Sequence, residues 1–321
     1  MNFRGAREYP VRHLPGRLRH HGAQNEDGIV LVIVLLITVL LATLVIEFAY
    51  SVFLATSSLN NWQDSKRLGI AAASSITHLN KWLVSPEAAQ FRSKPSIEME
   101  IPLKKDGCKG RERFDRITVC MEDESAKFNL NTLVYAQNGL RNDEACKIFA
   151  RLLSNLNLDT NLAGTIVDWM DRDEVSESLK GETGAKNEPF VTPDELLLIP
   201  GIDKEVYARL RRFVTIWGNQ LADINLNTAP REVIMSLGEN ITPETADRIV
   251  AYRENQPLKP QDIDQIAPDA KWDTSFGSPS TVGTAYFIRL TGECDGIKRI
   301  IETAEVAGSG NTMVTKYWKE Y

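Results

Sequence analysis

The chain has 321 residues, of which 43% are hydrophobic and 25% charged, and it is long enough for two modest domains. Its formal net charge is −6, and residues 1–28 carry five arginines against three acidic side chains, so the rest of the chain is acidic. An acidic body does not suit a protein that holds nucleic acid by neutralising its phosphates.

An apolar run follows this basic segment. Residues 29–46 contain no charge and no proline, and only Thr38 and Thr43 interrupt them. A membrane-spanning helix needs about 20 apolar residues, a length that the run reaches once Phe48 and Ala49 are included. Because arginines precede it, residues 1–28 should stay in the cytoplasm and the body should lie outside. A secretory signal peptide is the alternative, but its apolar region is usually only about 7–15 residues long.

The junction before the run is polar and ends in glycine, at Asn25-Glu26-Asp27-Gly28. It resembles the junction of type IV prepilins and type II secretion pseudopilins, which a membrane prepilin peptidase cuts after the glycine and then methylates. The resemblance implies that residues 1–28 are a cleaved leader and that the mature chain starts at methylated Ile29. The fifth mature residue, usually glutamate in this class, is Ile33. Absence of that glutamate is a feature of the K-type minor pseudopilin, a tip subunit with no neighbour above it to pair with.

Helical spacing continues beyond the membrane. Four apolar residues fall on one face: Trp62, Ile76, Leu79 and Leu83. Pro86 marks the stop, so the sequence predicts a helix of roughly 55 residues, half in the membrane and half packed on a globular head. His78 is the single histidine after residue 28 and lies within this helix, which is typical of a structural histidine rather than a catalytic one.

The remaining chain changes pattern twice. Alternating apolar and polar residues over 97–121 predict a hairpin, and similar alternation at 286–290 and 300–304 predicts further strands. Residues 129–255 between them follow a helical pattern. Strands on both sides of a helical block predict an α+β fold, in which an antiparallel sheet is interrupted by an inserted helical domain.

We therefore expect a cleaved leader, a transmembrane helix, a pilin-like α+β head in two segments, and an inserted α-helical domain. In that order the segments are 1–28, 29–49, 50–123 with 281–321, and 124–280.

The helical block contains an internal repeat. Phe128-Asn129-Leu130-Asn131-Thr132 recurs as Ile224-Asn225-Leu226-Asn227-Thr228. An extended piece that ends in Asn and Thr predicts a helix cap, so Asn131 or Thr132, and Asn227 or Thr228, should accept the free amides of the following helix. Coincidence of a five-residue pattern is the alternative.

Further helices are predicted at 145–156, 162–169 and 244–253. Thr192 and Glu195 form a capping-box pattern, and Pro200-Gly201 then turns the chain into a helix over 204–212. This unit resembles a helix-hairpin-helix, which the helix over 244–253 would match after the second repeat.

Four motifs follow the anchor in a fixed order: Asn-Leu-Asn-Thr, Asp-Trp-Met-Asp-Arg-Asp, Asn-Glu-Pro-Phe with Glu-Leu-Leu-Leu-Ile-Pro-Gly-Ile, and Ile-Asn-Leu-Asn-Thr-Ala. Over nearly the whole chain, this order resembles the K-type minor pseudopilin of the type II secretion system. The resemblance implies a single-pass inner-membrane protein with its head in the periplasm. It also implies a complex with the I-type and J-type minor pseudopilins at the pseudopilus tip, and contact with the major pseudopilin.

The most chemical stretch is the acidic segment 168–174, which a polar loop follows. Calcium takes six to eight oxygen ligands, often from clustered carboxylates, and the resemblance implies a calcium site here. We expect Asp171 and Asp173 as ligands, followed by Asp168 and Glu182. The segment lacks the glycine and final glutamate of an EF-hand, and a solvated acidic loop is the alternative.

The four cysteines are Cys108, Cys120, Cys146 and Cys294. In an oxidising periplasm Cys108 and Cys120 would close a short loop. The alternative is four reduced or buried thiols.

Catalysis has little support, because the chain after residue 28 has one histidine, no GxSxG elbow and no phosphate-cradling loop. We predict a non-enzymatic tip subunit that initiates or caps the pseudopilus for protein export across the outer membrane. One alternative is a membrane-anchored periplasmic protein that binds nucleic acid through the helix-hairpin-helix-like unit, which the acidic charge disfavours. Another is a membrane-tethered hydrolase that uses the acidic loop.

Overall fold

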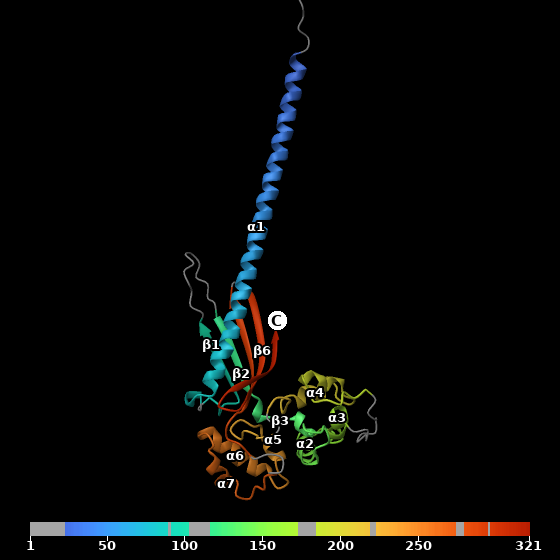
Figure 1. Ribbon diagram of the computed structural model, residues 1–321, viewed down its shortest axis with the longest axis vertical. Coiled ribbons are helices and arrows are strands. Elements are labelled where there is room, and N and C mark those ends of the chain that lie inside the picture. The colour runs from blue at the N-terminus through green and yellow to red at the C-terminus, as the bar shows by residue number, and fades with distance from the viewer. Residues whose placement is uncertain are drawn as a thin grey trace, which may run out of the picture. The chain divides into compact units, whose positions relative to one another are not determined.

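The computed structural model describes residues 23–88, 91–102, 116–172, 184–218, 223–273, 279–294 and 296–321. The chain divides into two compact units, Met1–Trp62 and Gln63–Tyr321. Figure 1 shows the elements of both units. The segment boundaries predicted above stay predictions.

Helix α1 runs from Ala23 to Leu83, and a 3₁₀ helix, η1 (Pro86–Ala88), begins at the predicted stop. Proline lacks the amide that would continue the hydrogen-bond ladder, which explains why α1 ends just before Pro86. Within the second unit, one face of α1 is buried from Leu68 onward. Trp62, predicted on that face, is instead 58% exposed, because the buried face begins one and a half turns later.

The second unit contains a five-stranded antiparallel sheet in the order β1-β2-β5-β6-β7. The strands are β1 (Ser96–Pro102), β2 (Arg116–Asp123), β5 (Ala285–Cys294), β6 (Ile297–Ala307) and β7 (Met313–Glu320). Alternate residues of β2 and β5 form one core with Ala72, Ile76, Leu79 and Leu83 of α1. The predicted α+β fold, with a long N-terminal helix on an antiparallel sheet, is therefore confirmed.

A buried carboxylate lies where α1 meets the sheet. Glu305 of β6 has no exposed surface, and its Oε2 accepts a hydrogen bond from Asn80 of α1 at 2.9 Å. Thr303 and Thr315 donate their hydroxyls to the same carboxylate. The strand pairing shifts register at Ala304/Glu305, and a β-bulge of this kind re-aims a side chain. These bonds fix the position of α1 along the sheet.

The residues between β2 and β5 are mainly helical and have their own core, in which Phe128 stacks on Phe149 with ring centroids 5.2 Å apart. The α-helices are α2 (Asp143–Asn155), α3 (Leu162–Met170), α4 (Lys204–Leu210), α5 (Arg231–Ser236), α6 (Pro243–Asn255) and α7 (Pro260–Ile266). The shorter elements are η2 (Glu124–Ala126), β3 (Phe128–Asn129), η3 (Leu130–Leu133), η4 (Pro193–Leu198) and β4 (Val214–Thr215).

The helix-hairpin-helix interpretation is not confirmed. Glu195 accepts the amides of Val191 and Thr192, as the capping box predicts. The element that this box starts, however, is the 3₁₀ helix η4 rather than an α-helix. Gly201 follows with φ +93°, a conformation that favours glycine, and turns the chain toward α4.

The first copy of the repeat forms a side-chain clamp. Asn129 accepts a hydrogen bond from the amide of Asn131 at 3.0 Å, and Thr132 donates its hydroxyl to the Asn129 carbonyl. The side chain of Asn131 therefore binds backbone groups that are distant in the sequence. It donates to the carbonyls of Phe190 and Ile216, both at 3.0 Å, and accepts the Phe190 amide at 2.8 Å.

The second copy repeats this geometry. Asn225 accepts the amide of Asn227 at 3.1 Å, and the Thr228 hydroxyl oxygen lies 3.3 Å from the Asn225 carbonyl oxygen. The side chain of Asn227 donates to the carbonyls of Leu258 and Thr281, and it accepts the Leu258 amide at 2.7 Å. The repeat is therefore structural, and each copy ties together one half of the helical block.

The predicted capping role of these residues is wrong. Helix α2 is capped by Asn142, which accepts the amide of Ala145, and α5 starts after Pro230 without a side-chain cap. Asn131 and Asn227 bind distant backbone groups because the first asparagine of each copy already accepts the local amide.

Candidate functional site

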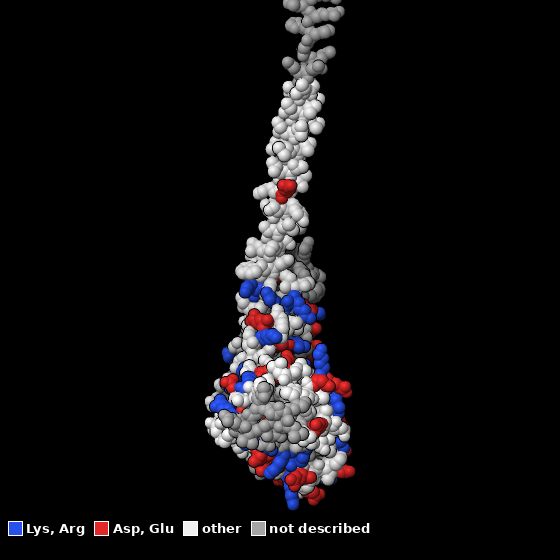
Figure 2. All heavy atoms as spheres, turned by 90° about the vertical axis from the view of Figure 1, so that its right-hand side faces the viewer, with Lys and Arg blue, Asp and Glu red and all other residues white. Residues whose placement is uncertain are grey.

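The start of α1 has the composition of a membrane anchor. By length and composition, the helical stretch Gly28–Leu83 is able to cross a membrane, and its most apolar 18 residues have a mean hydropathy of 3.5. Figure 2 shows this part of the helix almost without charged side chains. The large apolar residues from Ile29 to Phe48 are all exposed. So much apolar surface in water would be costly, which favours burial in lipid or against other helices.

The predicted processing site lies at the head of this stretch. Within the first unit, nothing lies within 4 Å of the place where a side chain at Gly28 would begin. Ile33, at the position where the wider class has glutamate, is half exposed on the same helix. Cleavage after Gly28 and methylation of Ile29 stay predictions.

A second candidate region is the junction between β2 and the helical block, in the second unit. Asp123 ends β2 and is 2% exposed. Its Oδ1 accepts the amide and the hydroxyl of Ser125, and its Oδ2 accepts Asn225 Nδ2 at 2.7 Å and Thr228 Oγ1 at 2.6 Å. Ser125 in turn accepts the amide of Thr284, just before β5. This network joins the end of β2, the second repeat and the start of β5.

Sequence reasoning did not identify this network. Asn225 and Thr228 were noticed as members of the repeat, but nothing in the local pattern connects them to Asp123, about a hundred residues earlier. The arrangement contains hydrogen-bond donors around one carboxylate and no nucleophile–base pair, so it can hold the head and the helical block together.

The network predicts a pH dependence. Burial raises the pKa of Asp123 and outweighs the hydrogen bonds that lower it. The folded protein therefore binds this proton more tightly than the unfolded chain, whose aspartates have a pKa of about 4. The stability that Asp123 contributes is thus fully present below about pH 4 and is lost as the pH rises through the folded-state pKa.

We expect the free energy of unfolding of Asp123→Asn to increase relative to that of the wild type as the pH rises from about 4. Urea unfolding of the full chain in detergent, from pH 4 to pH 8, measures it. Asp247→Asn is the control, because Arg231 lowers the pKa of that exposed carboxyl. This variant should therefore lose stability relative to the wild type as the pH rises. If the wild type instead becomes more stable relative to Asp123→Asn as the pH rises, the pKa of Asp123 is not raised in the folded protein.

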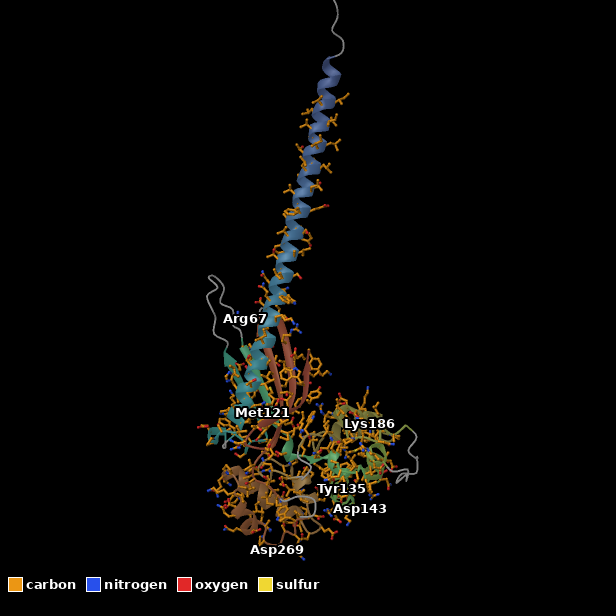
Figure 3. All side chains as sticks on the ribbon, viewed as in Figure 1. Arg67, Met121, Tyr135, Asp143, Lys186 and Asp269 are labelled. Atoms are coloured by element: carbon orange, nitrogen blue, oxygen red, sulfur yellow. The ribbon has the colours of Figure 1, made fainter. Side chains whose placement is uncertain are left out.

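The acidic segment lies at the C-terminal end of α3. Asp168 and Asp171 are 3% and 1% exposed. The amides of Lys186 and Asn187 both bind the carbonyl of Trp169, so the chain returns to this helix end after the loop. The Lys186 ammonium, labelled in Figure 3, pairs with Glu195 at 2.7 Å.

Two of the four predicted calcium ligands, Asp168 and Asp171, are thus buried at the end of α3, and the other two, Asp173 and Glu182, lie outside the described residues. Among the residues that are described, no group of three metal-binding side chains gathers. Cys108 also lies outside them, and Cys120 is exposed on β2, so the pairing of these two cysteines stays a prediction. His78 is exposed on α1.

Comparisons with known proteins agree with the order of motifs. Two family models, both described as "Type II secretion system (T2SS), protein K", match residues 126–219 and 224–270. Each match contains one copy of the repeat near its start.

Two curated relatives and one solved structure give further similarities to type II secretion proteins. Type II secretion system protein K of Aeromonas hydrophila is 25% identical over 62% of this chain and 69% of its own length. The protein of the same name from Klebsiella pneumoniae is 29% identical over 35% of this chain and 39% of its own length. A chain of the GspK-GspI-GspJ complex from enterotoxigenic Escherichia coli has the same fold, with a TM-score of 0.52 and 16% identity over 83% of this chain and 99% of that chain. Residues 126–219 and 224–270 therefore carry the two regions that the family models of type II secretion system protein K describe.

Proposed function

We propose that this chain is a minor pseudopilin at the tip of the type II secretion pseudopilus, where it initiates or caps assembly for protein export across the outer membrane. The observation that carries the proposal is the apolar run of α1, which begins directly after Gly28 and has no acidic residue at Ile33, in a helix whose later part packs on an antiparallel sheet. A subunit with no neighbour above it has no buried amino terminus to neutralise, so it does not need that glutamate.

In this proposal the chain crosses the inner membrane once and its head lies in the periplasm. The arginines before the apolar run support this orientation, since basic residues favour the cytoplasmic side. The chain acts by packing and binding rather than by catalysis. The prepilin peptidase and the major pseudopilin would be its further partners.

The I-type and J-type minor pseudopilins are the proposed partners in the tip. The support is the fold shared with a chain from a complex of K, I and J proteins. The exposed apolar surface at the start of α1 is of the kind that helix packing in a membrane buries.

Capture from membranes tests this assembly. We expect an affinity-tagged I-type pseudopilin from the same organism, purified in mild detergent, to carry this chain and the J-type protein with it. The control joins residues 1–62 to an unrelated periplasmic domain, which keeps the anchor and removes the second unit. Equal capture of the full chain and the control protein, or capture of neither, would contradict specific assembly through this chain's head.

The end of α3 is the proposed calcium site. Asp168 and Asp171 supply carboxylate oxygens, the ligand type that calcium prefers, and Asp173 and Glu182 are the further ligands expected from the sequence. Bound calcium would fasten the segment after α3 to the end of that helix.

We expect calcium, but not magnesium, to raise the thermal unfolding midpoint of the full chain in detergent. A ligand at 100 times its dissociation constant stabilises a folded protein by about 2.7 kcal/mol. Asp171→Asn should lose most of the effect, whereas Asp143→Asn, which changes an exposed carboxyl paired with Arg141, should retain it. If calcium does not raise the unfolding midpoint, or raises it equally in both variants, calcium does not bind at this site.

A further inference from the structure

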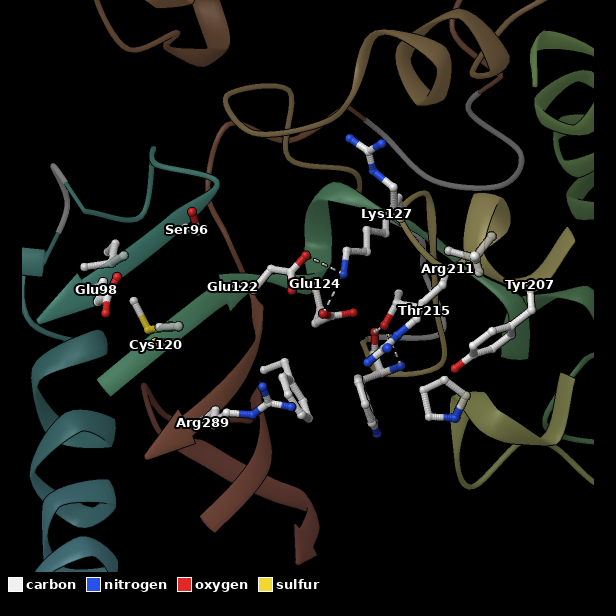
Figure 4. Close-up of a pocket in the computed structure, with 18 residues that line it drawn as sticks. Ser96, Glu98, Cys120, Glu122, Glu124, Lys127, Tyr207, Arg211, Thr215 and Arg289 are labelled. Carbon is white, nitrogen blue, oxygen red and sulfur yellow. Dashed lines mark hydrogen bonds and ion pairs between the residues drawn. The ribbon is translucent and has the colours of Figure 1, made fainter. Parts of the chain in front are cut away.

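A groove between the sheet and α4, in the described part of the second unit, is not used by the proposed function. Its volume is about 690 Å³, within the range of about 300–1,000 Å³ that is usual for ligand sites. One wall is the face of the sheet that α1 does not cover, and the other is formed by α4 and the segments around it (Figure 4).

The floor of the groove is aromatic. Trp217, just after β4, stacks on Phe287 of β5 with ring centroids 5.1 Å apart and an interplanar angle of 15°. Tyr317 of β7 packs against the same indole at 5.7 Å. Stacked rings of this kind hold their geometry without a ligand, so the floor is preformed.

Most charges that line the groove are already neutralised. Lys127 pairs with Glu122 and Glu124, each at 2.8 Å. Arg289 is held by Glu302, with its Nε 2.8 Å from the carboxylate. These pairs fix the shape of the walls but leave little charge for a ligand.

Two arginines that line the groove are not neutralised in this way. Arg211 and Arg212, at the end of α4, line the groove and are exposed, and neither forms an ion pair within the residues that the structure describes. Figure 4 shows Arg211 reaching into the groove from the wall opposite Arg289. A guanidinium group in this position suits a carboxylate, which it can bind through two parallel hydrogen bonds.

The sheet wall carries one acidic group of its own. Glu98 of β1, the strand at one edge of the sheet, lines the groove and is exposed, and it forms no ion pair within the described residues. The groove is therefore positive at α4 and negative at β1, so an acidic side chain would bind at the wall formed by α4.

We propose that this groove binds an extended, acidic segment of a partner protein. The segment lies along the groove between the face of the sheet and α4, an apolar side chain rests on Trp217 and Phe287, and an acidic side chain pairs with Arg211 and Arg212. The charge left over on the wall formed by α4 is positive, which selects an acidic segment over a basic one. This site is independent of leader processing and of the anchor.

Two fluorescein-labelled peptides test the proposal with the full chain in detergent. The first is acetyl-Gly-Val-Glu-Val-Glu-Val-Gly-amide, and the second has glutamine at both glutamates. Fluorescence anisotropy should show the acidic peptide binding at least about 10-fold more tightly, which is the effect expected for one charge-assisted pair. Arg211→Gln should remove this preference, whereas Arg231→Gln, which changes an arginine of α5 that pairs with Asp247, should keep it.

A native cysteine locates the bound peptide without any substitution. Cys120 is exposed and lines the groove, so the bound acidic peptide should slow its reaction with a maleimide several-fold. Binding that leaves the Cys120 rate unchanged and survives Arg211→Gln would place the peptide elsewhere and overturn the proposal. Absence of binding at millimolar peptide, or equal binding of both peptides, would overturn it too.

Discussion

Asn227→Ala should lower the free energy of unfolding by about 3 kcal/mol or more, because each buried polar group left without a partner costs about 1–3 kcal/mol. The side chain binds one amide and two carbonyls, those of Leu258 and Thr281. All three contacts join segments that are distant from Asn227 in sequence. Alanine can replace none of them, and the site is too closed for water to enter readily, since Asn227 is 5% exposed.

Urea unfolding of the full chain in detergent measures this effect. Asn255→Ala is the matched control, because Asn255 is exposed and makes one side-chain bond, to the carbonyl of Ala251 in the same helix. We expect the control to change stability by less than about 0.5 kcal/mol. Asn131→Ala, in the equivalent clamp, should resemble Asn227→Ala. A loss below about 1 kcal/mol for Asn227→Ala would show that the clamp does not hold its half of the block.

The elements that the sequence predicted well are those with a strong local pattern. The start of α1 is recognisable from composition alone, since an uncharged run of that length has few other uses. Strands β2 and β5 alternate because one face packs on α1 and the other does not. Helices α2 and α3 show an apolar face because they pack against one core.

The missed elements lack such a pattern. Strand β7 is an edge strand whose residues are mostly exposed on both faces, so no alternation marks it. Helix α7 has only seven residues and starts at Pro260, so it is too short to show a clear apolar face in the sequence. Strands β3 and β4 have two residues each and pair across more than eighty intervening residues, which no local signal reveals.

The internal repeat shows what a sequence pattern can predict and what it cannot. Its recurrence identified two equivalent positions, but the roles depend on backbone groups 31 to 85 residues away. The same limit applies to Asp123, whose partners Asn225 and Thr228 become neighbours only when the sheet and the helical block have folded. Asp168 and Asp171 lie within and just after α3, and their role as calcium ligands stays a prediction.

Gly28→Val should abolish maturation and, with it, protein export. Pilin-type leaders are cut after a glycine, and a branched side chain at that position would obstruct the peptidase. The uncut chain would keep its basic, cytoplasmic segment 1–28 in front of the apolar helix. That segment would prevent the head of α1 from packing among the helices of other subunits, because charged residues are costly in the membrane.

Gly69→Val is the matched control for this substitution. Gly69 lies further along the same helix, and nothing lies within 4 Å of the place where its side chain would begin. We expect this variant to be matured and to support export at nearly the wild-type level. Export is measured as the share of a secreted enzyme found outside the cells in a strain that lacks the chromosomal copy.

The mass of the N-terminal peptide decides whether this chain is processed as a pseudopilin. It is measured on protein from membranes that contain an active prepilin peptidase. We expect a chain that begins at methylated Ile29 in the wild type and in Gly69→Val, and an intact leader in Gly28→Val. A wild-type chain that begins at Met1, or that is cut after the apolar run, would contradict the assignment as a pseudopilin.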